Sequence, residues 1–292
     1  MSQPGRVAVV TDSTAYLPAS FAAGLRVVPL QVVLDGRSRA EGLEVTSGQV
    51  AEALVARRQV TTSRPAPAQF AQTYRELAAE GATAVVSVHL SGELSGTVAA
   101  ARSAAAEVAA EGIDVQVVDS RSLGLGLAFA ARAALLAAGR GAGRAEVAQA
   151  AARSADGSAV WLYVDTLDYL RRGGRINPAA AMVGSALAVK PLLQLVDGRL
   201  ELFDRVRTAS RALARLEDVV VAAAGDRRVD IGVQHLAARE RAEDLAAVLR
   251  ARIPGIGDVF VSEVGAVVGA HVGPGMVGVV VADAVAPEAT GS

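Results

Sequence analysis

The sequence predicts an α/β protein built from two units, the first with a mostly parallel sheet and the second a smaller mixed α/β unit. Its 292 residues correspond to about two domains, since a domain typically takes roughly 100–200 residues. Short apolar runs alternate with stretches of helical periodicity, which is the pattern of parallel strands joined by crossover helices. Hydrophobic residues make up 52% of the chain and charged residues 20%, so a large core is expected.

The first unit is expected over residues 1–155. Its strands are predicted where apolar runs are short and bounded by turn residues, at 6–11, 27–33, 84–90 and 115–118. Its helices are predicted where apolar residues recur at helical spacing, as Phe70, Tyr74 and Leu77 do. They are expected near 18–24 and at 49–57, 69–80, 97–110, 123–138 and up to about residue 154.

The second unit is expected over residues 156–285, after a glycine- and arginine-rich stretch at 140–144. Asp197-Gly198 separates two apolar runs at 192–196 and 200–203, and this dipeptide favours the type I′ turn of a hairpin. Further strands are predicted at 160–164, 230–233, 258–262 and 277–282, and helices at 166–172, 178–187, 208–224 and 238–252. Residues 286–292 are expected to form a disordered tail.

Composition excludes several classes of function. A net charge of −1 and an aromatic content of 3% argue against a nucleic-acid partner, which would select a basic surface and stacking rings. The chain has no cysteine, and its three histidines form no H-x-x-x-H pair, so neither a metal site nor another cofactor is expected. The uncharged stretch 264–282 contains five glycines and Pro274, and it is better explained by a turn, a short helix and a buried strand than by a membrane span. The first residues lack a signal-peptide layout, which predicts a cytoplasmic protein.

Three segments, at 10–14, 60–65 and 91–97, carry hydroxyl groups or glycines where a strand is expected to lead into a helix. Backbone amides and the helix dipole at such junctions favour an anion. The candidate ligand-binding residues are Ser13, Thr62, Ser63, Ser95 and Gly96. Helix capping is the alternative for each segment, and it is the stronger interpretation for the first. No P-loop motif is present, and Ser95 in Gly-Glu-Leu-Ser-Gly lacks the spacing of a nucleophile elbow.

Arginines and one histidine form the other candidate group. Residues 170–176 read Leu-Arg-Arg-Gly-Gly-Arg-Ile, so Arg172 and Arg175 flank a tight turn. Arg205 and Arg207 form a second cluster, and guanidinium groups suit contacts with phosphate or carboxylate. His271 lies among glycines, which predicts a loop position from which its imidazole contacts an anion. The alternatives are a solvated charged face for the arginines and a core position for the histidine.

Taken together, six motifs in order resemble the DegV family. They are Val-Thr-Asp-Ser-Thr at 10–14, Thr-Ser-x-Pro at 62–65, Leu-Ser-Gly-Thr at 94–97, Val-Asp-Ser at 118–120, Arg-Arg-Gly-Gly-Arg-Ile at 171–176 and Gly-Ala-His-Val-Gly-Pro-Gly at 269–275. The resemblance implies two α/β domains that hold a long-chain fatty acid. It also implies that Thr62 and Ser95 donate hydrogen bonds to the carboxylate, with His271 close by. Arg64 replaces the usual glutamine, Ala66 the usual serine, and Glu93 places a carboxylate near this loop.

The resemblance further implies a partner kinase that phosphorylates the bound acid to acyl phosphate, so the chain itself is not expected to be an enzyme. By this analogy Arg172, Arg175, Arg205 and Arg207 face the partner or the incoming phosphoryl group. A sixteen-carbon tail gains on the order of 11 kcal/mol from burial before entropic costs, which favours a tightly held lipid. Two other functions stay open on the sequence: an enzyme acting alone on an acyl or phosphorylated substrate, and a lipid-sensing regulatory module.

Overall fold

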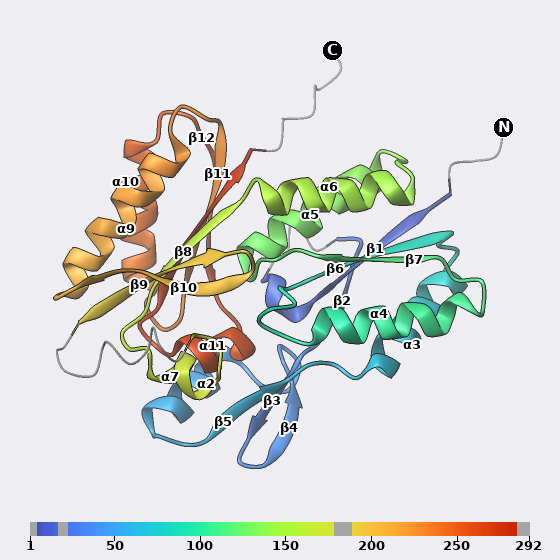
Figure 1. Cartoon of the computed structure of the whole chain (residues 1–292), viewed down its shortest axis with the longest axis horizontal. Coiled ribbons are helices and arrows are strands. Elements are labelled where there is room, and N and C mark those ends of the chain that lie inside the picture. Colours follow the sequence, from blue (N-terminus) through green and yellow to red (C-terminus); the bar gives the residue numbers. More distant parts are fainter. Residues whose placement is uncertain (1–4, 17–22, 178–188, 285–292) are drawn as a thin grey trace.

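A computed structural model describes residues 5–16, 23–177 and 189–284 of the chain. Three sheets organise these residues (Figure 1). The first is a four-stranded parallel sheet in the order β2 (Leu25–Val28), β1 (Val7–Asp12), β6 (Ala84–His89), β7 (Val115–Asp119). Every residue of β6 is buried, which explains why its sequence is apolar without alternation.

The strands in the second half of the chain form a six-stranded mixed sheet. Its order is β10 (Arg199–Val206), β9 (Lys190–Val196), β8 (Ala159–Tyr163), β13 (Val277–Asp283), β11 (Val229–His235), β12 (Ile256–Glu263). Only the β11–β12 pair is parallel within this sheet. Asp197 and Gly198 both have positive φ between β9 and β10, so the predicted type I′ hairpin is confirmed.

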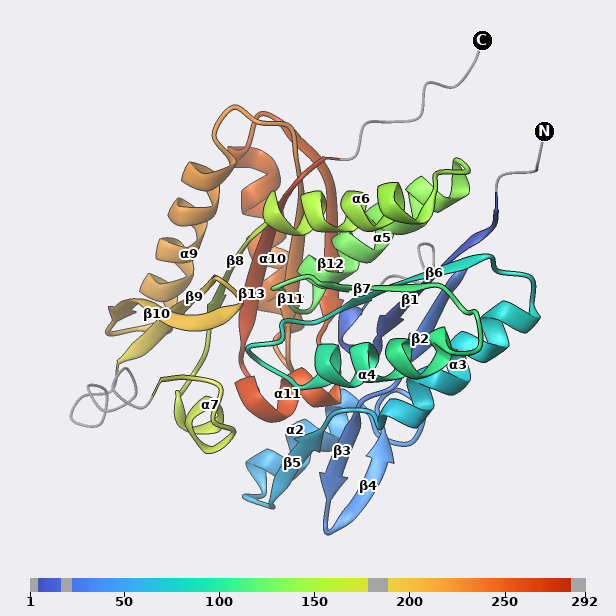
Figure 2. The same ribbon diagram turned by 45° about the vertical axis from the view of Figure 1, so that its right-hand side comes forward.

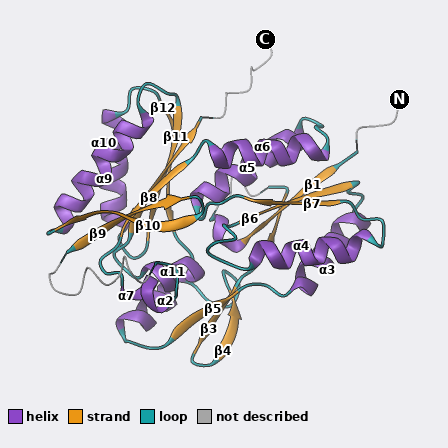
Figure 3. Ribbon diagram, viewed as in Figure 1, coloured by secondary structure: helices purple, strands orange, loops and turns teal. Residues whose placement is uncertain are grey.

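Helices form layers on both sides of these sheets (Figures 1 and 3). The helices α3 (Pro67–Ala79) and α4 (Thr97–Ala109) cover one face of the parallel sheet, and α9 (Ala209–Ala224) and α10 (Arg239–Arg252) cover the outer face of the mixed sheet. Between the two sheets lie α5 (Leu125–Gly139) and α6 (Arg144–Asp156), which contact both. One apolar cluster therefore runs from β1 and β6 through α5 to Val160 and Val280. The predicted fold class, two α/β units with a parallel and a mixed sheet, is confirmed.

A third, antiparallel sheet was not predicted. It has the order β4 (Arg37–Ala40), β3 (Gln31–Leu34), β5 (Val60–Ser63), and α2 (Ser47–Val55) follows β4 in the chain. The expected strand at 27–33 is wrong because Pro29 separates β2 from β3, and the two strands join different sheets. Asp35 and Gly36, both with positive φ, make the tight turn between β3 and β4.

The short helix α11 (Ala266–Val272) packs against this small sheet. It contacts α2, α7 (Asp168–Arg172), β3 and β5 (Figure 2). The expected turn, short helix and buried strand over 264–282 is thus confirmed.

The helices expected near 18–24 and at 178–187, and the tail at 286–292, fall wholly or largely outside the described residues. Within residues 5–16, 23–177 and 189–284, none of the helices has the length and hydropathy needed to cross a membrane.

Candidate ligand-binding site

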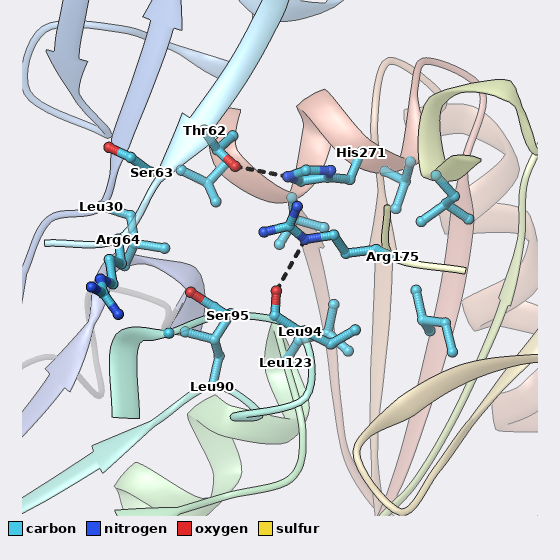
Figure 4. Close-up of a pocket in the computed structure, with 16 residues that line it drawn as sticks. Leu30, Thr62, Ser63, Arg64, Leu90, Leu94, Ser95, Leu123, Arg175 and His271 are labelled. Atoms are coloured by element: carbon cyan, nitrogen blue, oxygen red, sulfur yellow. Dashed lines mark hydrogen bonds between the residues drawn. The ribbon is translucent and has the colours of Figure 1, made fainter. Parts of the chain in front are cut away.

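A cavity of about 250 Å³ opens where the small sheet, α4, α7, α11 and β10 meet (Figure 4). Most of its wall is aliphatic, and it includes Leu30, Leu90, Leu94, Leu123, Leu170, Leu200, Val267, Val268 and Val272. Its polar lining is confined to Thr62, Ser63, Arg64, Ser95, Gly96, Arg175 and His271. An apolar wall with a few polar groups is the usual composition of a site for a small amphipathic ligand.

The predicted residues reach this cavity from distant parts of the chain. Thr62 and Ser63 lie at the end of β5, and Ser95 and Gly96 lie immediately before α4. Residues 60–65 lead from a strand into a helix, as expected, since β5 is followed by α3, but β5 is an antiparallel strand paired with β3 and not part of the parallel sheet. His271 is not on a loop, since it occupies the last turn of α11. Thr62 is thus held by a strand and His271 by a helix, whereas Ser95 and Gly96 lie in the turn before α4.

Thr62 and His271 form a direct polar contact. The Thr62 Oγ1 and His271 Nε2 atoms are 2.8 Å apart (Figure 4). Burial, with a further contribution from the charge of Arg175, lowers the pKa of His271 to about 4. The imidazole is therefore neutral at neutral pH, and a direct charge pair with an anion would require a ligand that raises this pKa.

Arg175 supplies the positive charge of the cavity. Its side chain extends toward the space below His271 (Figure 4). The Nε donates to the Leu94 carbonyl oxygen at 3.0 Å, and the guanidinium also donates to the Gly173 carbonyl. Within the described part of the chain, no carboxylate pairs with Arg175. A guanidinium that is anchored on carbonyls and lacks a counter-ion favours an anionic ligand beside it.

Ser95 and its neighbours complete the polar end. The Ser95 Oγ lies 2.8 Å from Thr97 Oγ1, and no side chain caps the first amides of α4. The Arg64 side chain lies across Gly96, where an added Cβ would be 2.6 Å from a guanidinium nitrogen. Glu93 pairs with Arg199 at 2.7 Å and does not line this cavity. Its carboxylate is therefore engaged with Arg199 and does not repel an anion in this cavity.

The structure does not bring Ser13 into the cavity lining. Its hydroxyl donates to Glu41 and accepts a hydrogen bond from the Leu30 amide at 3.0 Å. The structure thus gives Ser13 an indirect role, because it fixes the residue before β3 whose side chain lines the cavity. The first hydroxyl segment is used mainly for internal bonding, as the capping alternative suggested, and Asp12 accepts from the Thr14 amide at 3.1 Å.

The predicted arginines separate into two groups. Arg172 lies near Arg175, but its guanidinium stacks on the Tyr169 ring at 4.9 Å and lines a neighbouring cavity. Arg205 is at the end of β10 and Arg207 follows it, exposed. Neither is part of the wall of the 250 Å³ cavity. That these arginines face a partner stays a prediction, and Arg175 lies inside the cavity rather than at the outer surface.

Sequence reasoning missed Glu41, which is 5% exposed and supports α11. Its carboxylate accepts from the Val267 amide at 2.7 Å, from the Tyr16 hydroxyl at 3.2 Å and from Ser13. Burial raises the pKa of Glu41 to about 7. Nothing in the sequence Ala40-Glu41-Gly42 separates this residue from an exposed turn glutamate, because its partners lie on remote segments.

Glu41 should make folding stability depend on pH. Its pKa is raised from 4.5 to about 7, so the folded protein binds the proton more tightly than the unfolded chain. Stability from this group is therefore greatest below pH 4.5 and is lost as pH rises to about 7, by about 3 kcal/mol. His271 acts oppositely, because its lowered pKa costs stability as pH falls from 6.5 toward 4. The free energy of unfolding, measured with urea, should differ less between Glu41→Gln and the natural chain at pH 5 than at pH 8. At pH 8 the variant should gain stability relative to the natural chain. A parallel pH dependence in both proteins would contradict this assignment.

Comparison with known proteins places this chain in a family. The family model that matches residues 6–284 is that of the DegV family, described as uncharacterised proteins. A DegV domain-containing protein of Streptomyces coelicolor is 55% identical over 277 residues, which is 94% of this chain and 98% of that protein. A Mycobacterium tuberculosis DegV domain-containing protein is 41% identical over 97% of this chain and 99% of its own.

Solved structures agree with the fold. A DegV family protein from Thermus thermophilus, described as binding fatty acid, superposes with a TM-score of 0.89 at 34% identity, covering 96% of this chain and all of that one. DegV from Bacillus subtilis, described as a fatty acid binding protein, gives a TM-score of 0.87 at 30% identity, covering 96% of this chain and 100% of that one. The fold and the cavity define a two-unit α/β protein with an apolar pocket and a polar end. The chain belongs to the DegV family, as its six motifs indicated.

Proposed function

We propose that this protein binds a long-chain fatty acid, with its carboxylate at the polar end of the cavity and its tail along the aliphatic wall. The observation that carries the proposal is the convergence of Thr62, Ser95, His271 and Arg175 at one end of an otherwise apolar pocket. Two relatives of 30% identity or more are described as fatty acid binding, which supports the same ligand here.

The physical balance favours such a ligand. Each buried CH₂ group contributes about 0.8 kcal/mol, so the aliphatic wall provides most of the affinity. Desolvating a carboxylate is costly unless donors replace water. The Arg175 guanidinium and the Ser95 and Thr62 hydroxyls are donors within this lining. With a proton on Nε2, His271 donates to Thr62 and leaves the Thr62 hydroxyl proton for the ligand.

Organic extraction of the purified protein, followed by mass spectrometry, tests this ligand. We expect close to one fatty acid per chain when no delipidating step is used. The control is the same protein after passage over a hydrophobic resin. This protein should contain no fatty acid and should take up one equivalent of added palmitate. A folded, untreated sample that yields no fatty acid and does not take up palmitate would rule out the proposal.

We further propose that the protein presents the bound acid to a separate kinase, which phosphorylates it to an acyl phosphate. The sequence contains no P-loop motif, so the phosphoryl donor is expected on another protein. The polar end of the cavity is where a kinase would need access to the carboxylate. The exposed Arg207 is a candidate for contact with that kinase.

An Arg207→Ala variant separates lipid binding from presentation. We expect it to retain palmitate like the natural protein, because Arg207 is not part of the cavity wall. With a cognate fatty acid kinase, acyl-phosphate formation should fall by about tenfold, the effect of one lost charged contact. Arg250→Ala, on the exposed side of α10, is the matched control. Loss of lipid from Arg207→Ala would show that this residue is misplaced in the proposal.

A further inference from the structure

The start of α11 is capped by side chains from the other unit of the protein. Its own N-cap residue is Gly265, which has no side chain to bond the first amides of the helix. Glu41, 226 positions before Val267 in the chain, supplies the missing acceptor, because its Oε1 accepts from the Val267 amide at 2.7 Å. The Tyr16 hydroxyl accepts from the Val268 amide at 3.4 Å. A helix of the second unit is therefore held at its start by the first unit.

Gly265 allows these two side chains to approach the helix. A Cβ at this position would lie 2.4 Å from Glu41 Oε1 and 2.4 Å from Tyr16 Cε1. The φ of Gly265 is −74°, which any residue can adopt. The glycine is thus explained by the space that Glu41 and Tyr16 occupy, and not by the backbone.

The charge of Glu41 makes a purely stabilising role a poor explanation for this residue. Among the residues that the structure describes, no arginine, lysine or histidine forms an ion pair with Glu41. Burial raises its pKa to about 7, although hydrogen bonds from Ser13, Val267 and Tyr16 act in the opposite direction. Above this pH the buried charge costs folding stability. A costly group of this kind is often retained for function, here for the placement of the helix that it caps.

That helix carries part of the ligand site. Val267, Val268, Val272 and His271 all line the 250 Å³ cavity. His271 lies one helical turn after Val267, the residue whose amide Glu41 accepts. Its Nε2 is 2.8 Å from Thr62 Oγ1 on β5, a strand of the first unit. Because α11 is a short rigid element, a shift of about 1 Å at its start would break this hydrogen bond.

We propose that Glu41 is a positioning residue of the lipid site, which fixes α11 against the first unit and thereby holds His271 in contact with Thr62. Glu41 does not line the cavity, so it acts through the helix and not on the ligand. What the helix requires is an oxygen acceptor at this place, and the amide oxygen of a glutamine also provides one. The proposal rests on the proposed function for the identity of the ligand.

Palmitate titration of delipidated protein at pH 8 tests this role. Glu41→Ala removes the acceptor of the Val267 amide and should weaken palmitate binding about tenfold. Glu41→Gln keeps an oxygen acceptor and should recover most of that loss. The matched control is Glu52→Ala, since Glu52 is exposed on the neighbouring helix α2, and this variant should bind like the natural protein. Natural affinity in Glu41→Ala, or equal losses in Glu41→Ala and Glu41→Gln, would overturn the proposal.

Two further measurements show whether the effect passes through His271. In lipid-free protein, the ring ¹⁵N resonances of His271 should shift in Glu41→Ala and return toward their natural positions in Glu41→Gln. In a Thr62→Ala background, Glu41→Ala should weaken palmitate binding by less than about twofold, because the contact that it protects is already absent. A full additional tenfold loss in that background would mean that Glu41 acts elsewhere, and the proposal would fail.

Urea unfolding at pH 8 separates positioning from stability. Glu41→Gln should be more stable than the natural chain without binding palmitate more tightly, so affinities that follow the order of stability would contradict the proposed role. If Glu41→Ala does not fold, Tyr16→Phe replaces it, since this variant loses only the hydroxyl that contacts Glu41 and Val268 and should shift the His271 resonances less. If the natural protein binds no palmitate, the proposed function fails, while the His271 resonances of the lipid-free variants still decide whether Glu41 positions α11.

Discussion

Replacing both Thr62 and Ser95 by alanine should abolish retention of a fatty acid while the protein stays folded. The two side chains enter the cavity from β5 and from the start of α4, on opposite sides of its polar end (Figure 4). A hydrogen bond to a charged group contributes about 1.5–3 kcal/mol, so each substitution should weaken binding about 10- to 100-fold. Thr62→Ala should have the larger effect, because it also leaves His271 Nε2 without its partner.

Palmitate titration of delipidated protein measures this effect, and thermal unfolding checks the fold. Ser103→Ala is the control for Ser95→Ala, since Ser103 is exposed on the same helix, α4. We expect Ser103→Ala to bind palmitate like the natural protein. Unchanged binding in the Thr62→Ala and Ser95→Ala double variant would mean that the carboxylate lies elsewhere, and the proposed orientation of the lipid would be wrong.

Gly173→Ala should displace His271 and lose the ligand through that displacement. The φ of Gly173 is −75°, which alanine tolerates, so the backbone does not require glycine. However, a Cβ at this position would lie 2.1 Å from His271 Nδ1. His271 is half-buried with its Nδ1 atom shielded from solvent, and overpacking of this kind costs typically about 1–3 kcal/mol. The His271–Thr62 contact should break, and palmitate binding should fall with it.

Gly174→Ala is the matched control for this prediction. Gly174 has a φ of +69° and no atom within 4 Å of an added Cβ. Alanine there strains the backbone by about 1–2 kcal/mol but leaves His271 in place. Urea unfolding should therefore show a loss in both variants, whereas palmitate binding and the His271 resonances should change only in Gly173→Ala. Equal loss of binding in both would assign the effect to the turn as a whole.

Local sequence patterns determined most of the elements. Helical periodicity around Phe70, Tyr74 and Leu77 predicted α3, and Asp197-Gly198 predicted the hairpin of β9 and β10. These predictions succeeded because spacing and turn chemistry act within a few residues. The prediction of a single strand at 27–33 was wrong. Pro29 can be read from the sequence, but the sequence does not show that the chain passes from one sheet to another at this residue.

The candidate site was predicted only in part. Motifs identified Thr62, Ser95 and His271, and the structure brings these three to one cavity. The same reasoning chose Ser13, whose hydroxyl is used by Glu41 and Leu30, and it missed Glu41 itself. The sequence around a serine or threonine is the same whether its hydroxyl binds a ligand or a buried carboxylate, so local sequence does not identify the partner.

The sequence by itself determined an α/β chain of two units, without thiol chemistry, and the residue types able to hold an anion. Only the tertiary structure decided that β5 and α11, about 200 residues apart, place Thr62 beside His271, and that Arg175 points into the same cavity. It also decided that His271 is neutral, since burial and the charge of Arg175 lower its pKa. These properties depend on contacts between remote segments, whose distances are set by packing of the three sheets and the helices between them.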